Sequence, residues 1–241
     1  MPIRQVSYVF EFPTGEIFQH DLRSEATTLS LVPEPEEADG TEVTYPDWTR
    51  LGHCQCRHCP LSENDQPRCP ISVNVAQLVD AFRDVNSTLP VKISVHTDER
   101  TYLKEGPAQR GLASILGLIM ATSGCPHMDF LKPMARFHLP FATSEETIVR
   151  STSMYLLAQY FIARRGEAPD MKLTRLDEAY ARVQKVNFGV SARIRSAAET
   201  SRGDASSNAV VILFTVAQLL STAIEEKLDT IEDRFKGIVF P

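Results

Sequence analysis

The chain has 241 residues, of which 43% are hydrophobic and 23% charged, with a formal net charge of −6. This length suits one domain with a smaller additional module and allows a hydrophobic core that needs no disulfides. The negative charge argues against a nonspecific nucleic-acid surface and against binding to anionic membranes. The opening MPIRQVSYVF lacks the features of a secretory signal, and the longest apolar stretch, Ala209 to Leu220, is too short to span a bilayer. We therefore expect a cytoplasmic protein.

The first hundred residues show the patterns of strands and loops. Apolar and polar side chains alternate from Val6 to Phe12, and residues 13–15 supply a turn before a second strand-like run. Apolar residues at helical spacing follow Pro70 as far as Val85, which predicts an amphipathic helix. The elements expected in this half are a β-hairpin over 5–22, that helix, and two short strands over 91–95 and 101–103.

From Pro107 onward the spacing of apolar residues is helical. A first helix around residues 112–120 is apolar on nearly every face and is expected to lie in the core, with Gly124 as its C-terminal cap. The motif Thr143-Ser144-Glu145-Glu146 predicts a capping box at the start of a helix over 144–165. The remaining helices are expected over 171–187, 190–200 and 207–236.

This order of elements indicates an α+β fold, because strands come first and helices follow. We expect an N-terminal β-rich module over residues 1–106, containing a metal-binding loop at 50–70, and a five- or six-helix bundle over residues 107–241. The helix expected over 207–236 would run about 45 Å at 1.5 Å per residue, longer than a compact module needs. Its apolar positions predict a homo-oligomer formed through the helical half, with a neighbouring helix of the same chain as the alternative cover.

Four of the five cysteines, Cys54, Cys56, Cys59 and Cys69, lie within sixteen residues. A clustered, odd set of cysteines without a secretion signal indicates metal binding or catalysis rather than disulfides. Zinc takes four nitrogen or sulfur ligands, and a CxxC turn such as that from Cys56 to Cys59 lets two thiolates bind one ion. We predict a structural Zn²⁺ bound by these four thiolates, with His53 as the alternative to Cys54.

The charges around the cluster favour four thiolates over three thiolates and a histidine. A tetrathiolate zinc site is doubly negative and costly to bury without compensation, and Arg50, Arg57 and Arg68 flank the ligands in sequence. An iron–sulfur cluster is the second hypothesis, because a ligand cysteine precedes proline in ferredoxin motifs, although the CxCxxC spacing differs from theirs. Thiolate-ligated haem, suggested by three Cys-Pro dipeptides, and four unliganded thiols are weaker alternatives.

The fifth cysteine, Cys125, stands alone in the segment Ser123-Gly124-Cys125-Pro126-His127. A proline at the first position of a helix would make Cys125 the N-cap, where the helix dipole stabilises a thiolate. Cys125, His127 and His138 are then candidate catalytic residues, or ligands of a second metal together with Asp129 or Glu145. The simpler interpretation is a buried cysteine whose neighbouring histidines cap loops.

Two functions remain open from the sequence. The first is a zinc-stabilised binding or scaffold protein whose helical half presents a surface or pocket to an unknown target. The second is a thiol- or metal-dependent enzyme built on Cys125, favoured if an open pocket joins this thiol to a histidine. Basic residues such as Arg182 and Arg193 alternate with acidic ones, which indicates a solvated helix face rather than a nucleic-acid patch. The sequence holds no P-loop, GxGxxG, HExxH or GxSxG motif.

Overall fold

The computed structural model describes residues 2–32, 44–197, 203–222 and 224–237. Four antiparallel strands form one sheet in the order β2-β1-β3-β4. The strands are β1 Ile3–Glu11, β2 Ile17–Glu25, β3 Pro90–His96 and β4 Thr101–Pro107. The predicted hairpin over 5–22 and the predicted strand pair are thus confirmed, and β1 and β3 pair with each other in the middle of the sheet.

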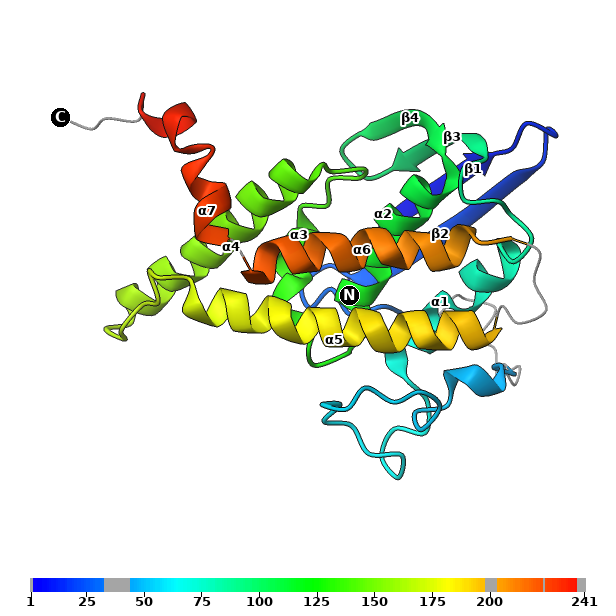
Figure 1. The fold of residues 1–241 in the computed structure, drawn as a ribbon, viewed down its shortest axis with the longest axis horizontal. Helices are drawn as coiled ribbons and strands as arrows, with labels where there is room; N and C mark the ends of the chain where they lie inside the picture. The colour runs from blue at the N-terminus through cyan, green and yellow to red at the C-terminus, as the bar shows by residue number, and fades with distance from the viewer. Residues whose placement is uncertain (1, 33–43, 198–202, 223, 238–241) are drawn as a thin grey trace.

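Six α-helices of the described residues follow the sheet, and one more lies between β2 and β3, so the predicted α+β fold is confirmed (Figure 1). The helices are α1 Pro70–Ala81, α2 Ala108–Thr122, α3 Lys132–Arg136, α4 Ser144–Arg164, α5 Thr174–Ala197, α6 Ala205–Thr222 and α7 Ile224–Asp229. Short 3-10 helices cover Asp47–Thr49, Asp129–Leu131 and Glu232–Phe235. No helix within these ranges combines the length and apolar character that crossing a bilayer requires.

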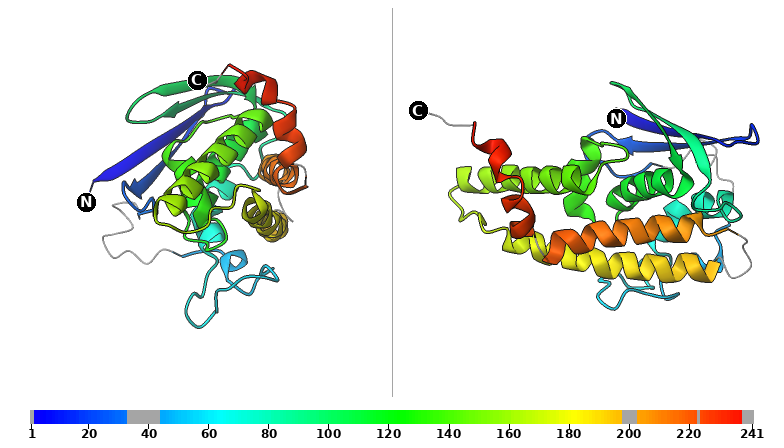
Figure 2. Two further views of the ribbon diagram at one scale, coloured as in Figure 1. Left: turned by 90° about the vertical axis from the view of Figure 1, so that its left-hand side faces the viewer. Right: turned by 45° about the horizontal axis from the view of Figure 1, so that its top comes forward.

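The helix α2 lies at the centre of the molecule, as its apolar sequence predicts. Figure 2 shows it between the sheet and the pair formed by α5 and α6. Gly111 lets α2 approach the sheet, since a Cβ there would lie 2.5 Å from a ring carbon of Phe10 and 2.6 Å from Ile93. Buried side chains of the sheet and of the helices belong to one hydrophobic cluster. The division of the chain between residues 106 and 107 stays a prediction.

Two helix predictions in the second half were wrong. Residues 174–197 form the single helix α5, where two helices were expected around Gly189. The expected helix over 207–236 is divided into α6, α7 and a 3-10 turn, and α7 contacts both α4 and α6. Arg234 then forms an ion pair with Glu145 in the first turn of α4. The long helix on which self-association was based is therefore absent from the described residues, and the homo-oligomer stays a prediction.

Residues at the two ends of the helix α4 determine where it begins and where it stops. Thr143 accepts a hydrogen bond from the backbone N–H of Glu146, and the Glu146 carboxylate accepts one from the backbone N–H of Thr143. This reciprocal pair is the predicted capping box, and it satisfies two donors that the first turn would leave unpaired. Gly166 follows the helix with a positive φ of 81°, a conformation that glycine adopts without strain.

Candidate metal centre

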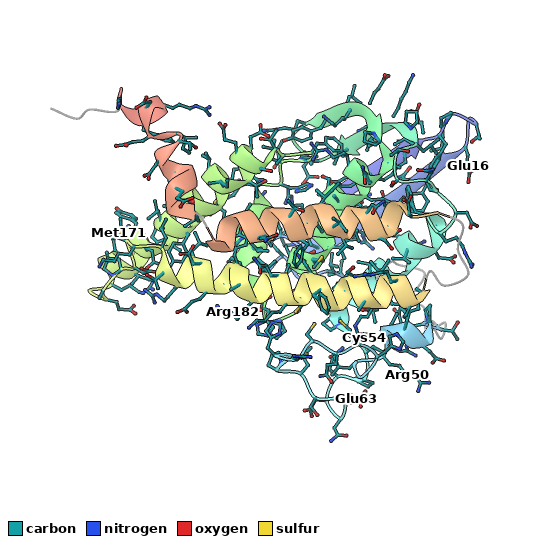
Figure 3. All side chains as sticks on the ribbon, viewed as in Figure 1. Glu16, Arg50, Cys54, Glu63, Met171 and Arg182 are labelled. Atoms are coloured by element: carbon teal, nitrogen blue, oxygen red, sulfur yellow. The ribbon has the colours of Figure 1, made fainter. Side chains whose placement is uncertain are left out.

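The cysteine-rich segment is a loop that projects from the body of the molecule. Its two ends are tied together where Arg50 and Arg68 pair as an isolated antiparallel bridge. The backbone N–H of Leu51 donates to the Pro67 carbonyl at 2.8 Å, and Leu51 itself is buried. Figure 3 shows the loop below α5, with Glu63 at its far end. The base of the loop is therefore ordered by the fold, whereas most side chains beyond it are exposed.

Cys56 lies at the contact between this loop and α5. A Cβ on Gly189 would be 2.5 Å from the Cys56 sulfur, so only glycine at this point of α5 lets the thiol approach. The Cys59 N–H donates to the Cys56 carbonyl at 2.9 Å, which closes the predicted CxxC turn. Burial raises the pKa of Cys56 to about 11, and negative charge on Cys69 and Cys59 would raise it further. The charges of Cys59 and Cys69 therefore act on the Cys56 thiol.

Arg193 of α5 is a buried cation beside this group of thiols. Its side chain is 2% exposed and donates to the carbonyls of Trp48 at 3.0 Å, Arg50 at 2.6 Å and Leu51 at 2.6 Å. Its positive charge lowers the pKa of Cys56, opposing the stronger effect of burial. The assignment of Arg193 to a solvated face was wrong, because helical periodicity does not reveal that a loop 140 residues earlier covers this position.

Two of the three arginines that the sequence suggested as compensating charges, Arg50 and Arg68, have other partners. Arg50 forms an exposed ion pair with Asp47 at 2.9 Å. Arg68 donates to Thr49 at 2.6 Å and to the Pro46 carbonyl at 3.2 Å, and it lies over the ring of Tyr45. These contacts hold the base of the loop, and the buried charge nearest to the thiols comes from α5.

Cys54 and His53 lie on the outer part of this arrangement. Cys54 is exposed, with a positive φ of 48°, and its carbonyl oxygen faces Gly189. The His53 ring is hydrogen-bonded through Nε2 to the Ser196 hydroxyl at 2.7 Å. Within the described residues, no three His, Cys, Asp or Glu side chains are arranged closely enough to hold a metal as they stand.

Cys125 is buried and is followed by a turn, so its prediction as a helix N-cap was wrong. The Met128 N–H donates to the Cys125 carbonyl at 2.8 Å, and only a 3-10 turn and the five-residue α3 follow. Burial raises the pKa of Cys125 to about 12, and the neighbouring charges of Cys69, Cys56 and Cys59 add to this increase. The fold thus brings Cys125 to the loop cysteines, from which it is separated by more than fifty residues.

The two candidate histidines lie in different surroundings. His127 stacks on His58 of the loop, with ring centroids 4.2 Å apart. His138 is hydrogen-bonded through Nε2 to the Tyr8 hydroxyl at 2.6 Å, and Tyr8 also contacts Ser114 at 2.7 Å. Burial, assisted by the charges of Arg150 and Arg4, lowers the pKa of His138 to about 3.

The two acids considered for a second metal are each paired with a base. Asp129 forms an ion pair with Lys132 at 2.9 Å, and Glu145 pairs with Arg234. His138 borders an apolar cavity of about 180 Å³ between α2 and the other helices, a different environment from that of Cys125 and His127. The second metal centre stays a prediction, and these contacts lend it no support.

The close approach of Cys56 to α5 predicts how a substitution of Gly189 changes the stability of the protein. In an unobstructed helix interior, glycine to alanine stabilises by up to about 1 kcal/mol. We expect Gly189→Ala to destabilise the protein by about 1–3 kcal/mol instead, because the new methyl group would overlap the Cys56 sulfur. Gly117→Ala in α2 is the matched control, since a Cβ there would make an ordinary 3.4 Å contact with Leu213. Equal stabilisation by both substitutions in urea unfolding would contradict the contact.

Comparison with known proteins gives a family and no activity. No curated protein and no protein of solved structure matches the chain. Residues 6–236 match the family described as Domain of unknown function (DUF6901), a span that includes the sheet, the cysteine loop and α2 to α7. Over this nearly complete span, the chain belongs to the DUF6901 family.

Proposed function

We propose that this protein binds one zinc ion through Cys56, Cys59 and Cys69 and one further ligand, and that the ion holds the loop at 50–70 against the helices. The observation that carries the proposal is that the Cys56 thiol packs against α5 at Gly189, while the buried Arg193 of the same helix binds the base of the loop, where Arg50 pairs with Arg68 next to Cys69. The three cysteines come from a CxxC turn and from the residue that precedes α1, which are the kinds of position that structural zinc sites use. A metal would compensate for the few other contacts of a loop of this length.

Charge supports thiolate ligation at this place. Zinc binds the deprotonated thiol. In the metal-free protein burial disfavours the Cys56 thiolate and raises its pKa, and a bound divalent cation would stabilise this thiolate. Arg193 reduces the remaining negative charge of a multi-thiolate site. An iron–sulfur cluster would use the same cysteines, and metal identity therefore forms part of the test.

We propose a binding or scaffold role for the zinc-stabilised protein in preference to thiol catalysis. A reactive cysteine needs a lowered pKa and access to solvent, whereas Cys125 has a raised pKa and is buried. The cavity beside His138 is lined mainly by apolar side chains, with Ser114 and Arg150 among its polar residues, and its volume of about 180 Å³ would admit only a ligand smaller than those of typical small-molecule sites. The enzyme built on Cys125, His127 and His138 remains the alternative.

Metal analysis of the purified full-length protein tests the zinc proposal. We expect about one zinc per chain in the wild type and almost none in Cys56→Ser or Cys69→Ser, together with a lower melting temperature in both variants. Asn64→Ser changes an exposed side chain in the same loop and should retain the metal. Unchanged metal content in both cysteine variants would overturn the proposal. Stoichiometric iron in the purified wild type would mean that the cysteines bind an iron–sulfur cluster instead of zinc.

A further inference from the structure

The segment that follows α2 turns back toward the cysteine loop. Gly124 has a positive φ of 85° just after the helix, a backbone conformation that a β-carbon would strain. The next residue, Cys125, is 9% exposed, so its thiol lies inside the molecule. Three residues on, the Met128 N–H closes a turn on the Cys125 carbonyl. The chain is thus reversed with a cysteine at the inner side of the turn.

Two histidines join this turn to the CxxC turn of the loop. His127 Nε2 donates a hydrogen bond to the His58 carbonyl at 2.8 Å. The rings of His58 and His127 are nearly parallel, with an interplanar angle of 19°. His58 immediately precedes Cys59, and His127 is two residues from Cys125, so this contact brings the two cysteine-bearing turns together. The electrostatic coupling of Cys125 to Cys69, Cys56 and Cys59 agrees with this placement.

Cys54, the fourth ligand expected from sequence spacing, is placed differently. It lies on the exposed side of the loop, and it is the Cys54 carbonyl that faces α5 beside the Cys56 thiol. Cys56 meets α5 at Gly189, the Cys69 N–H donates to the Thr49 carbonyl at the base of the loop, and the contact between His58 and His127 joins the turns that carry Cys59 and Cys125. The spatial group of thiols is therefore Cys56, Cys59, Cys69 and Cys125.

We infer that Cys125 is the fourth thiolate ligand of the proposed metal and that Cys54 is not a ligand. The inference rests on the proposed metal binding, and it changes what the metal does. With Cys54 the ion would close a local loop, but with Cys125 it links three segments: the loop, the start of α1 and the connection from α2 to α3. Three of these four cysteines, Cys59, Cys69 and Cys125, precede proline, which keeps their backbones out of the helical region before any metal binds.

Alkylation of the wild-type protein, mapped by mass spectrometry with and without a chelator, tests the ligand set without any substitution. In the zinc-loaded protein we expect Cys54 to react rapidly at the rate of an exposed thiol and the other four cysteines to be protected. Removal of zinc should leave the rate at Cys54 unchanged and increase labelling at Cys56, Cys59 and Cys69. Zinc-dependent protection of Cys54 would overturn the inference, even if the protein binds one zinc as proposed.

A matched pair of full-length variants gives a second measurement. Cys54→Ser should retain one zinc and, when loaded with Co²⁺, the same thiolate-to-cobalt absorption as the wild type. Cys125→Ser should weaken zinc binding by more than about 100-fold, because loss of a group that only orients a ligand already costs about 10–100-fold. If Cys125→Ser retains wild-type affinity while Cys54→Ser loses it, the inference fails and the metal site stands. If the wild type itself binds neither zinc nor cobalt, the proposed function fails.

Discussion

Replacing Arg193 by methionine is expected to lower the free energy of unfolding by about 3–5 kcal/mol. The guanidinium donates three hydrogen bonds to carbonyls at the base of the cysteine loop, and each bond from a charged donor contributes about 1.5–3 kcal/mol. We expect less than the full sum, because parts of this loop are exposed and allow a freed carbonyl to reach water. Urea unfolding at constant metal content measures the effect.

Arg195→Met provides the control for this prediction. Arg195 lies two residues further along α5, is exposed and, among the described residues, donates to Ser191 within its own helix. Its substitution should change the free energy of unfolding by no more than about 0.5 kcal/mol, as for most surface positions. A similar, small effect of both substitutions would show that the loop does not depend on Arg193. A large effect confined to Arg193 would establish α5 as the support of the cysteine loop.

Removal of the Phe82 ring should have a comparable effect on the other side of the molecule. Phe82 is the C-cap of α1, is 1% exposed and packs against Phe10 and Phe18 of the sheet, with ring centroids 5.0 Å and 5.2 Å away. Both contacts are edge-to-face, the favourable arrangement for aromatic rings. Phe82→Ala would leave a cavity between α1 and the sheet and should lower the free energy of unfolding by about 3–5 kcal/mol.

The control for Phe82 is Phe188→Ala in α5, because Phe188 is 66% exposed. Its loss should change stability by about 0.5 kcal/mol or less. The ratio of the two effects in urea unfolding distinguishes a packed α1–sheet interface from a loose one. Equal, small effects would mean that the C-cap residue Phe82 does not fix α1 to the sheet.

Elements whose signals are local could be predicted from the sequence. The hairpin of β1 and β2 follows from a two-residue alternation and a glycine turn, and α4 begins at a capping box whose partners are three residues apart. The apolar surface of α2 on every face predicted its central position. In each case the stabilising contacts are between near neighbours, or depend on hydrophobicity alone, so they do not require knowledge of the partner.

Other features depend on contacts between segments distant in sequence. Two helices were expected over 171–187 and 190–200, yet Gly189 lies inside the single helix α5, where the absence of its side chain makes room for Cys56. The periodic apolar residues after 207 indicated one long helix, but the chain is divided into α6 and α7, and α7 contacts both α4 and α6. A glycine looks the same in the sequence whether it lies inside a helix or between two helices, and an apolar period looks the same in one long helix or two short ones. The segment that packs against it decides which structure forms.

The sequence by itself determined the α+β class, the sheet-forming hairpins and the clustering of four cysteines in one loop. Only the tertiary structure decided which cysteines the fold brings toward one another. Cys54 is two residues from Cys56 but faces outward, while Cys125, 56 residues after Cys69, is brought to the group by the turn after α2 and the contact between His127 and His58. Arg193 joins them from α5. Metal ligation and charge compensation depend on distance in space, and separation along the chain does not reveal that distance once a loop is folded back onto helices.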